Sequence, residues 1–158
     1  MNILGIDNGL LGALSTYNGE ELMVYDMPTY KIGKRNHINI SELAKLILND
    51  RPDHAFIEKL TPLPKISGLT AFSMGHSEGL VLGLLTAYNI PYTLVRPAEW
   101  KKIMRCPKDK DAARMRASQL LPAFTDNWPL KKHDGRAESA LIAYYGWGEM
   151  TKPQGMRL

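Results

Sequence analysis

The sequence predicts an α/β fold in which a mixed five-stranded sheet carries helices on its faces. The apolar segments begin with three strand-like runs that follow one another as a meander, an order that favours antiparallel pairing. Strand-like and helical segments then alternate, as they do where parallel strands are joined by helices. The chain has 158 residues, no internal repeat and no linker-like stretch, so we expect residues 1–158 to form a single domain.

The expected strands are short, and turn residues separate them. The dipeptide Asn18-Gly19 lies between two apolar runs and predicts a hairpin. Pro91 opens the last strand, and Arg51-Pro52-Asp53 separates a helix from the fourth. The five expected strands are 2–6, 11–17, 21–27, 54–58 and 92–96.

Helical spacing of apolar residues predicts five helices and leaves three irregular segments. Ser41 is placed to cap the first helix. The second helix carries Gly75, Gly79 and Gly83 on one face, which favours close packing against either a partner subunit or the chain's own sheet. Residues 28–39 and 61–68 are expected to be loops, and about 149–158 a frayed tail. The expected helices are 40–48, 69–88, 97–104, 109–121 and 136–147.

Bulk composition excludes several classes of protein. Apolar content is 44% and charged content 23%, ordinary values for a globular chain. No apolar stretch approaches the ~18 residues of a membrane span, and no secretory signal is visible at the start. Cys106 is the only cysteine, which precludes an internal disulfide and fits a reducing compartment. We therefore expect a cytoplasmic protein that makes no membrane contact.

Four acidic residues lie at the ends of apolar segments. Asp7 closes the first strand, Glu58 closes the fourth, and Asp134 and Glu138 lie four apart at the start of the last helix. Carboxylates at the ends of buried strands are costly unless they bind a cation. Sites in open α/β sheets lie at the carboxyl ends of strands, and residues four apart share one side of a helix. The pattern therefore predicts a single metal site that folding assembles.

Oxygen ligands favour Mg²⁺, and two such ions can support phosphodiester hydrolysis. Three of the four acids also have a simpler interpretation, since Asp7 fits a turn, Asp134 an N-cap and Glu138 a solvated helix face. His133 is a possible acid, base or metal ligand beside Asp134, or a solvated loop residue. The four histidines are too scattered for a zinc site.

Basic residues gather in three clusters, although the net charge is only +4. Residues 101–116 hold seven Lys or Arg, residues 31–37 hold Lys31, Lys34, Arg35 and His37, and residues 131–133 adjoin the last acidic pair. Each cluster alone could be a solvated surface. Together they favour contact with a phosphate backbone.

Several stretches resemble RuvC-like Holliday junction resolvases, especially short phage and prophage members. The resemblance rests on five stretches that occur in order along nearly the whole chain. It departs from many cellular resolvases at the last acidic pair, which those proteins space three apart or begin with a histidine. The third acidic position is therefore shared between His133 and Asp134. The stretches are Ile3–Gly9, Ala55–Lys59, Pro91–Lys102, Lys108–Arg114 and His133–Ala143.

The resemblance implies a ribonuclease H-like fold, a homodimer and metal-dependent nicking of branched DNA, above all four-way junctions, with 5′-phosphate and 3′-hydroxyl ends. Asp7, Glu58, Asp134 and Glu138 would hold two Mg²⁺ ions, for which Mn²⁺ is expected to substitute. Alternatives are a ribonuclease H or flap nuclease on the same fold, or an inactive junction-binding protein. The residues expected to contact DNA are Lys101, Lys102, Lys108, Lys110, Arg114, Lys131, Lys132 and Arg136.

Overall fold

The computed structural model describes residues 1–61, 64–107 and 110–153, and it has the predicted mixed sheet of five strands in the order β3-β2-β1-β6-β7. β1 pairs antiparallel with β2 and parallel with β6, so the central strand joins the meander to the parallel half. All five expected strands are present, with ends shifted by at most two residues. They are β1 (Ile3–Asp7), β2 (Ala13–Tyr17), β3 (Leu22–Asp26), β6 (His54–Glu58) and β7 (Tyr92–Val95).

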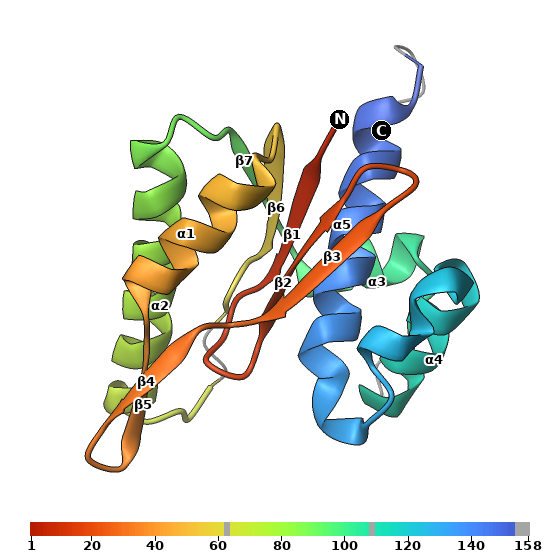
Figure 1. The fold of residues 1–158 in the computed structure, drawn as a ribbon. Coiled ribbons are helices and arrows are strands. Elements are labelled where there is room, and N and C mark those ends of the chain that lie inside the picture. The colour runs from red at the N-terminus through yellow and green to blue at the C-terminus, as the bar shows by residue number, and fades with distance from the viewer. Residues whose placement is uncertain (62–63, 108–109, 154–158) are drawn as a thin grey trace.

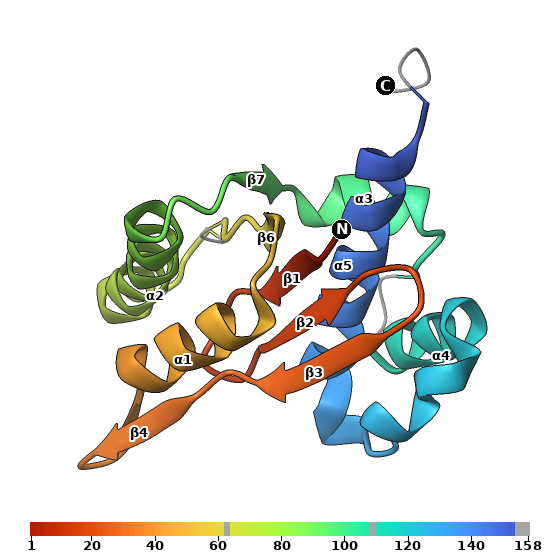
Figure 2. The same cartoon turned by 45° about the horizontal axis from the view of Figure 1, so that its top comes forward.

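Helices cover both faces of this sheet, which gives the chain three layers. Figures 1 and 2 show α1 and α2 on one face, and α5 with α3 and α4 on the other. Two short 3-10 helices, η1 and η2, lead into α5. No helix in the described ranges is long and apolar enough to cross a membrane. The bounds are α1 (Ile40–Asp50), α2 (Gly68–Ala87), α3 (Pro97–Ile103), α4 (Lys110–Leu120), η1 (Pro122–Asn127), η2 (Lys131–His133) and α5 (Asp134–Thr151).

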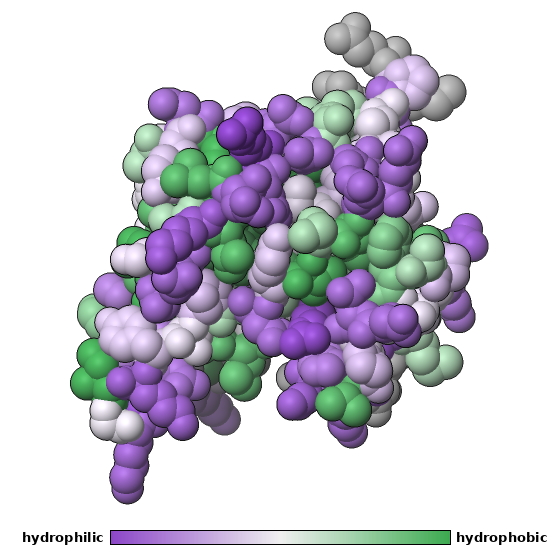
Figure 3. Space-filling view, viewed as in Figure 1, coloured by the Kyte–Doolittle hydropathy of each residue, from purple (hydrophilic) through white to green (hydrophobic). Residues whose placement is uncertain are grey.

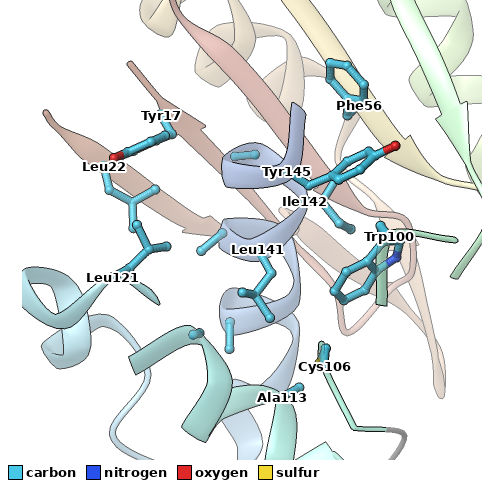
Figure 4. Packing of buried hydrophobic residues seen from close by; sticks show 14 of the residues in the cluster. Tyr17, Leu22, Phe56, Trp100, Cys106, Ala113, Leu121, Leu141, Ile142 and Tyr145 are labelled. Atoms are coloured by element: carbon cyan, nitrogen blue, oxygen red, sulfur yellow. The ribbon is translucent and has the colours of Figure 1, made fainter. Parts of the chain in front are cut away.

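Alternation along the strands divides the buried side chains into two cores. Leu4 and Ile6 of β1 face α1 and α2, whereas Ile3 faces α5. Figure 4 shows the second core, in which the ring of Phe56 lies 5.8 Å from that of Tyr145 in α5. α5 can approach β1 closely because position 5 is glycine, where an added Cβ would lie 2.3 Å from the backbone nitrogen of Ala143. This close approach brings the start of α5 to the end of β1.

Residues 28–39 form a β-hairpin, so the predicted loop is wrong. Its strands are β4 (Thr29–Ile32) and β5 (Arg35–Ile38), and Gly33 makes the turn with a positive φ of 60°. The Asn39 N–H donates to the Pro28 carbonyl over 2.8 Å and closes the base of the hairpin. Figures 1 and 2 show it projecting from the rest of the molecule.

The ends of two helices also differ from expectation. Asn39, not Ser41, caps α1, because its side chain accepts a hydrogen bond from the Glu42 N–H over 3.2 Å. α5 continues to Thr151, so the expected tail begins later than predicted. Its last turns are held by aromatic packing, since the ring of Trp147 lies 5.7 Å from that of Tyr17.

Candidate functional site: a carboxylate cluster at the strand ends

Asp7 and Glu58 lie side by side at the carboxyl ends of neighbouring parallel strands. In the register of β1 and β6, Ile6 is opposite Ile57, and each acid follows immediately. Alternation turns both carboxylates toward α5, because Phe56, two residues before Glu58, packs against Tyr145 of that helix. The sheet therefore brings together two acids that are far apart in the sequence.

The first turn of α5 brings the second pair of acids to the end of β1. Gly135 is buried against Asp7, and a Cβ at this position would lie 3.0 Å from the Asp7 Oδ2 atom. Asp134 and Glu138 flank this glycine, and with Asp7 they line one open cleft of about 800 Å³. Figure 3 shows a notch in the lower outline of the molecule, between the hairpin side and the α4–α5 side. Three of the four predicted acids thus face a shared space.

Glu58 lies beside this cleft, close enough to Glu138 for the two charges to interact. The indole Nε1–H of Trp100, which is fully buried, donates to Glu58 Oε2 over 2.8 Å. Burial raises the pKa of Glu58, the Trp100 hydrogen bond opposes that rise, and the charge of Glu138 adds to it. Glu58 is therefore a desolvated carboxylate close to a second one, an arrangement that favours binding of a cation.

Lys101 supplies one positive charge inside the cluster. Its Nζ donates to Glu138 Oε1 over 2.7 Å, and it lies 5.1 Å from the centre of the Trp100 ring. Burial opposes the charge on Lys101, but the hydrogen bond and charge of Glu138, together with the charge of Glu58, outweigh it and raise the pKa. This lysine was predicted to contact DNA, and the structure places it among the carboxylates.

Asp134 and His133 also have protein partners. The Arg114 Nε atom lies 3.3 Å from Asp134 Oδ1 and forms an ion pair with it. The His133 Nδ1 atom accepts a hydrogen bond from the Leu130 N–H over 3.3 Å. Desolvation and the charges of Arg136 and Lys132 lower the pKa of His133, so its neutral form is favoured. Both residues line the cleft, and each remains a candidate for the third acidic position.

The remaining predicted DNA contacts have varied surroundings. Arg136 forms a two-pronged ion pair with Asp26, with its Nε and one terminal nitrogen each 2.6 Å from a carboxylate oxygen. Lys132 is exposed and lines the cleft, and Lys102 and Lys131 are also exposed. Lys108 lies outside the described residues, as does the side chain of Lys110.

The oxygen ligands of the four acids suit a hard divalent cation, although the four carboxylates do not converge on one position. Among the residues that the structure describes, no three His, Cys, Asp or Glu side chains are close enough to share an ion. Lys101 and Arg114 instead form ion pairs with Glu138 and Asp134. Carboxylate oxygens with one strongly desolvated member are nonetheless the chemistry that Mg²⁺ or Mn²⁺ accepts.

Sequence reasoning missed two residues of this site. Trp100 was noted only as part of a family-like stretch, and Asp26 was not considered at all. Asp26 ends β3 and lines the cleft. The search for acids at the carboxyl ends of strands, which identified Asp7 and Glu58, would also have identified Asp26. Trp100 lies within α3, the helix that Pro97 opens, and no local pattern connects it with Glu58.

Comparisons with known proteins agree with this geometry. No family model matches the chain. A crossover junction endodeoxyribonuclease RuvC from Carboxydothermus hydrogenoformans is 27% identical over 162 residues, covering 95% of this chain and 98% of that protein. Thermus thermophilus RuvC in complex with a Holliday junction substrate has a TM-score of 0.65 at 15% identity, covering 96% of this chain and 97% of that one.

Two further solved structures share the fold. A Fowlpox virus resolvase, crystallised with Holliday junction DNA, has a TM-score of 0.54 at 15% identity and covers 96% of this chain and 100% of that one. The yeast mitochondrial Holliday junction resolvase Ydc2 has a TM-score of 0.52 at 19% identity, covering 92% of this chain and 76% of that one. The chain is therefore similar in sequence to a RuvC crossover junction endodeoxyribonuclease, and it has the ribonuclease H-like fold of the solved RuvC structures.

Proposed function

We propose that this chain is a structure-selective DNA endonuclease that cuts four-way junctions by metal-dependent hydrolysis. The observation that carries the proposal is the meeting of Asp7 and Glu58 with the first turn of α5. A buried carboxylate beside a second one has no structural advantage, but it suits a site that binds cations and phosphate. The relatives with the same fold include two solved with Holliday junction DNA.

The four acids Asp7, Glu58, Asp134 and Glu138 would hold the metal, which we propose to be two Mg²⁺ ions, with Mn²⁺ as a substitute. Such ions lower the pKa of a bound water and stabilise the leaving oxygen of a phosphodiester. Trp100 positions Glu58 through its hydrogen bond, so this carboxylate needs little reorientation. When Glu138 binds the metal in place of Lys101, the ammonium group of this lysine would become available to a DNA phosphate.

The basic residues around the cleft would contact DNA. Lys132 lines the cleft itself, and Lys131 precedes it in η2. Lys101 and Lys102 end α3 on the other side of Glu138. Arg136 is held by Asp26, so we propose that it supports the rim of the cleft and reaches phosphate only if that pair opens. Arg114 lines the cleft side of α4 through its ion pair with Asp134, and Lys108 and Lys110 stay predicted DNA contacts from the sequence.

We further propose that two copies of the chain associate through α2. Its buried face is Ser77, Val81 and Leu85, whereas Gly75, Gly79 and Gly83 lie on another face with open space beside each. The glycines therefore do not pack on the chain's own sheet, which was one of the two expectations. Two exposed apolar side chains near the start of the same helix, Leu69 and Phe72, suit an interface.

Cleavage of a mobile four-way junction with Mg²⁺ tests the function. The products should be paired nicks at symmetric positions with 5′-phosphate and 3′-hydroxyl ends. An RNA–DNA hybrid and a Y-shaped fork at equal salt serve as competing substrates. Preferred cutting of the hybrid would make the chain a ribonuclease H, and preferred cutting of the fork would make it a flap nuclease. Junction binding without metal-dependent turnover would identify an inactive binding protein.

A Glu58→Gln variant tests the site within the same assay. It should retain junction binding and lose cleavage, because the amide keeps an oxygen acceptor for Trp100 but has no negative charge. Glu99→Gln, on the exposed surface of α3, is the matched control and should cut normally. Cutting by the Glu58→Gln variant at the wild-type rate would contradict the assignment.

A further inference from the structure

The hairpin of β4 and β5 lies at the rim of the acidic cleft and projects away from it. Thr29, the first residue of β4, lines the cleft together with Asp7 and Glu138. From that point the hairpin extends outward, with every residue of β4 exposed to solvent. A four-residue strand is roughly 13 Å long. The tip of the hairpin therefore lies roughly 13 Å from the rim of the acidic cleft.

The charge of this hairpin has one sign. Residues 28–40 contain no Asp or Glu, and Lys31, Lys34 and Arg35 are exposed. Within the described part of the chain, none of these three forms an ion pair, whereas Lys101, Arg114 and Arg136 near the acids all do. Three adjacent exposed cations without counter-charges attract a polyanion.

One face of the hairpin combines one of these charges, that of Arg35, with apolar surface. Tyr30 is opposite His37 and Ile32 is opposite Arg35 in the strand register, so alternation places all four on the same face. The rings of Tyr30 and His37 lie 5.7 Å apart, and Ile32 is 59% exposed. This face therefore presents an aromatic and an aliphatic side chain to solvent beside a cation.

From this arrangement we infer that the hairpin is a second DNA-contacting element, which rests against one duplex arm of the substrate. The inference depends on the proposed function, and it specifies which part of the substrate the hairpin contacts. A two-stranded ribbon fits the major groove, and phosphates repeat about every 3.4 Å along a strand. The tip would thus contact the arm roughly four base pairs from the scissile phosphate. A second copy of this hairpin is a poor occupant, because like charges would face each other.

Removal of the three charges tests the inference. A triple variant with Lys31→Gln, Lys34→Gln and Arg35→Gln is compared with a control that loses three charges elsewhere, Lys45→Gln, Arg51→Gln and Lys152→Gln. Both are made on the Glu58→Gln background, so that a fluorescent four-way junction stays uncut, and affinity is measured from 50 to 200 mM salt. Three lost phosphate contacts reduce the slope of log affinity against log salt by about 2.7 for each hairpin that contacts DNA. From 50 to 200 mM salt, the protein with intact hairpins should then lose about 40-fold more affinity than the triple variant for each bound hairpin.

The outcomes separate this inference from the function itself. The inference is wrong, and the proposed function stands, if the wild-type chain cuts junctions while the hairpin variant keeps the salt slope of the control. If the chain with an intact hairpin neither binds nor cuts junctions, the proposed function fails first. Sedimentation of both variants gives a third readout, because conversion of only the hairpin variant to a slower species would show a protein interface and overturn the DNA assignment.

Discussion

At the scale of the residue, Glu58 shows the conflict between stability and function most directly. Burial raises its pKa, so between the usual carboxyl pKa of 4.5 and the raised value the folded state binds more protons than the unfolded state. Stability therefore falls as pH rises through this window, and above it the protein carries the whole cost of the buried charge. In EDTA at pH 7, Glu58→Gln should raise Tm by about 2–4 °C, as expected for roughly 1 kcal/mol in a chain of this size.

The pH dependence identifies the cause of that gain. The advantage of Glu58→Gln in EDTA should shrink as pH falls toward 4, where the wild-type carboxyl is protonated in both states. Added Mg²⁺ should reverse the order, because it stabilises the protein that binds it. Thermal melts at several pH values, with and without metal, give both comparisons. A Tm for the variant below that of the wild type in EDTA at pH 7 would show that burial of the charge is not costly.

Trp100 has a separate effect, through the hydrogen bond that it donates to Glu58. Trp100→Phe removes the donor and keeps most of the ring, so the pKa of Glu58 should rise further. We expect kcat to fall about tenfold with little change in KM, and the acid limb of the pH–rate profile to move to higher pH. Trp128→Phe is the control, because this equally buried indole donates to Ser118 Oγ. If the acid limb of the pH–rate profile did not move in Trp100→Phe, Trp100 would contribute only packing to the site.

At the scale of the element, the contact between the first turn of α5 and the end of β1 depends on Gly135, as the approach of the middle of α5 to β1 depends on Gly5. In Gly135→Ala the added Cβ would lie 2.8 Å from the Leu11 carbonyl oxygen and 3.0 Å from Asp7 Oδ2. We expect a loss of about 1–3 kcal/mol in the free energy of unfolding, together with loss of cleavage. Gly148→Ala in the same helix meets no atom within 4 Å and should stabilise by up to about 1 kcal/mol. Denaturant unfolding compares the two, and equal effects would contradict the steric account.

The sequence predicted those elements whose signals are local. β1 and β6 end in an acid after a continuous apolar run, and the hairpin of β2 and β3 has Gly19 at a φ of 102°. The hairpin at 29–38 was missed because its cations resemble a solvated loop, although Tyr30, Ile32 and Gly33 are strand and turn residues. A two-stranded ribbon buries little apolar surface, so hydrophobic patterning cannot distinguish it from a loop.

The candidate site was predictable only in part, for a related physical reason. Strand ends and helical spacing identify Asp7, Glu58 and Glu138 as acids that could meet. The hydrogen-bond partners of these acids are set by tertiary packing. Lys101 pairs with Glu138, 37 residues away in the sequence, and Trp100 with Glu58, 42 residues away. A basic cluster in sequence is therefore a mixture of groups that neutralise acids and groups that remain available to DNA.

At the scale of the whole molecule, resolution of a junction requires two incisions, and one chain has a single acidic cleft among its described residues. The glycine face of α2 is where we propose that a second copy binds. In Gly79→Arg a long cation enters open space on this face, so the fold of the single chain should be preserved. The pair of chains should separate, because an unpaired charge would be buried in the interface.

The consequence for activity distinguishes this interface from any effect on the cleft. The Gly79→Arg variant should sediment as a single chain and nick junctions on one strand, without the paired cuts that resolve them. Gly148→Arg introduces the same charge on α5, also in open space, and should leave both association and paired cutting intact. Symmetric paired nicks from a Gly79→Arg protein that sediments as one chain would show that the second incision does not depend on the α2 interface. The two clefts would then act by successive binding, and the glycines would need another explanation.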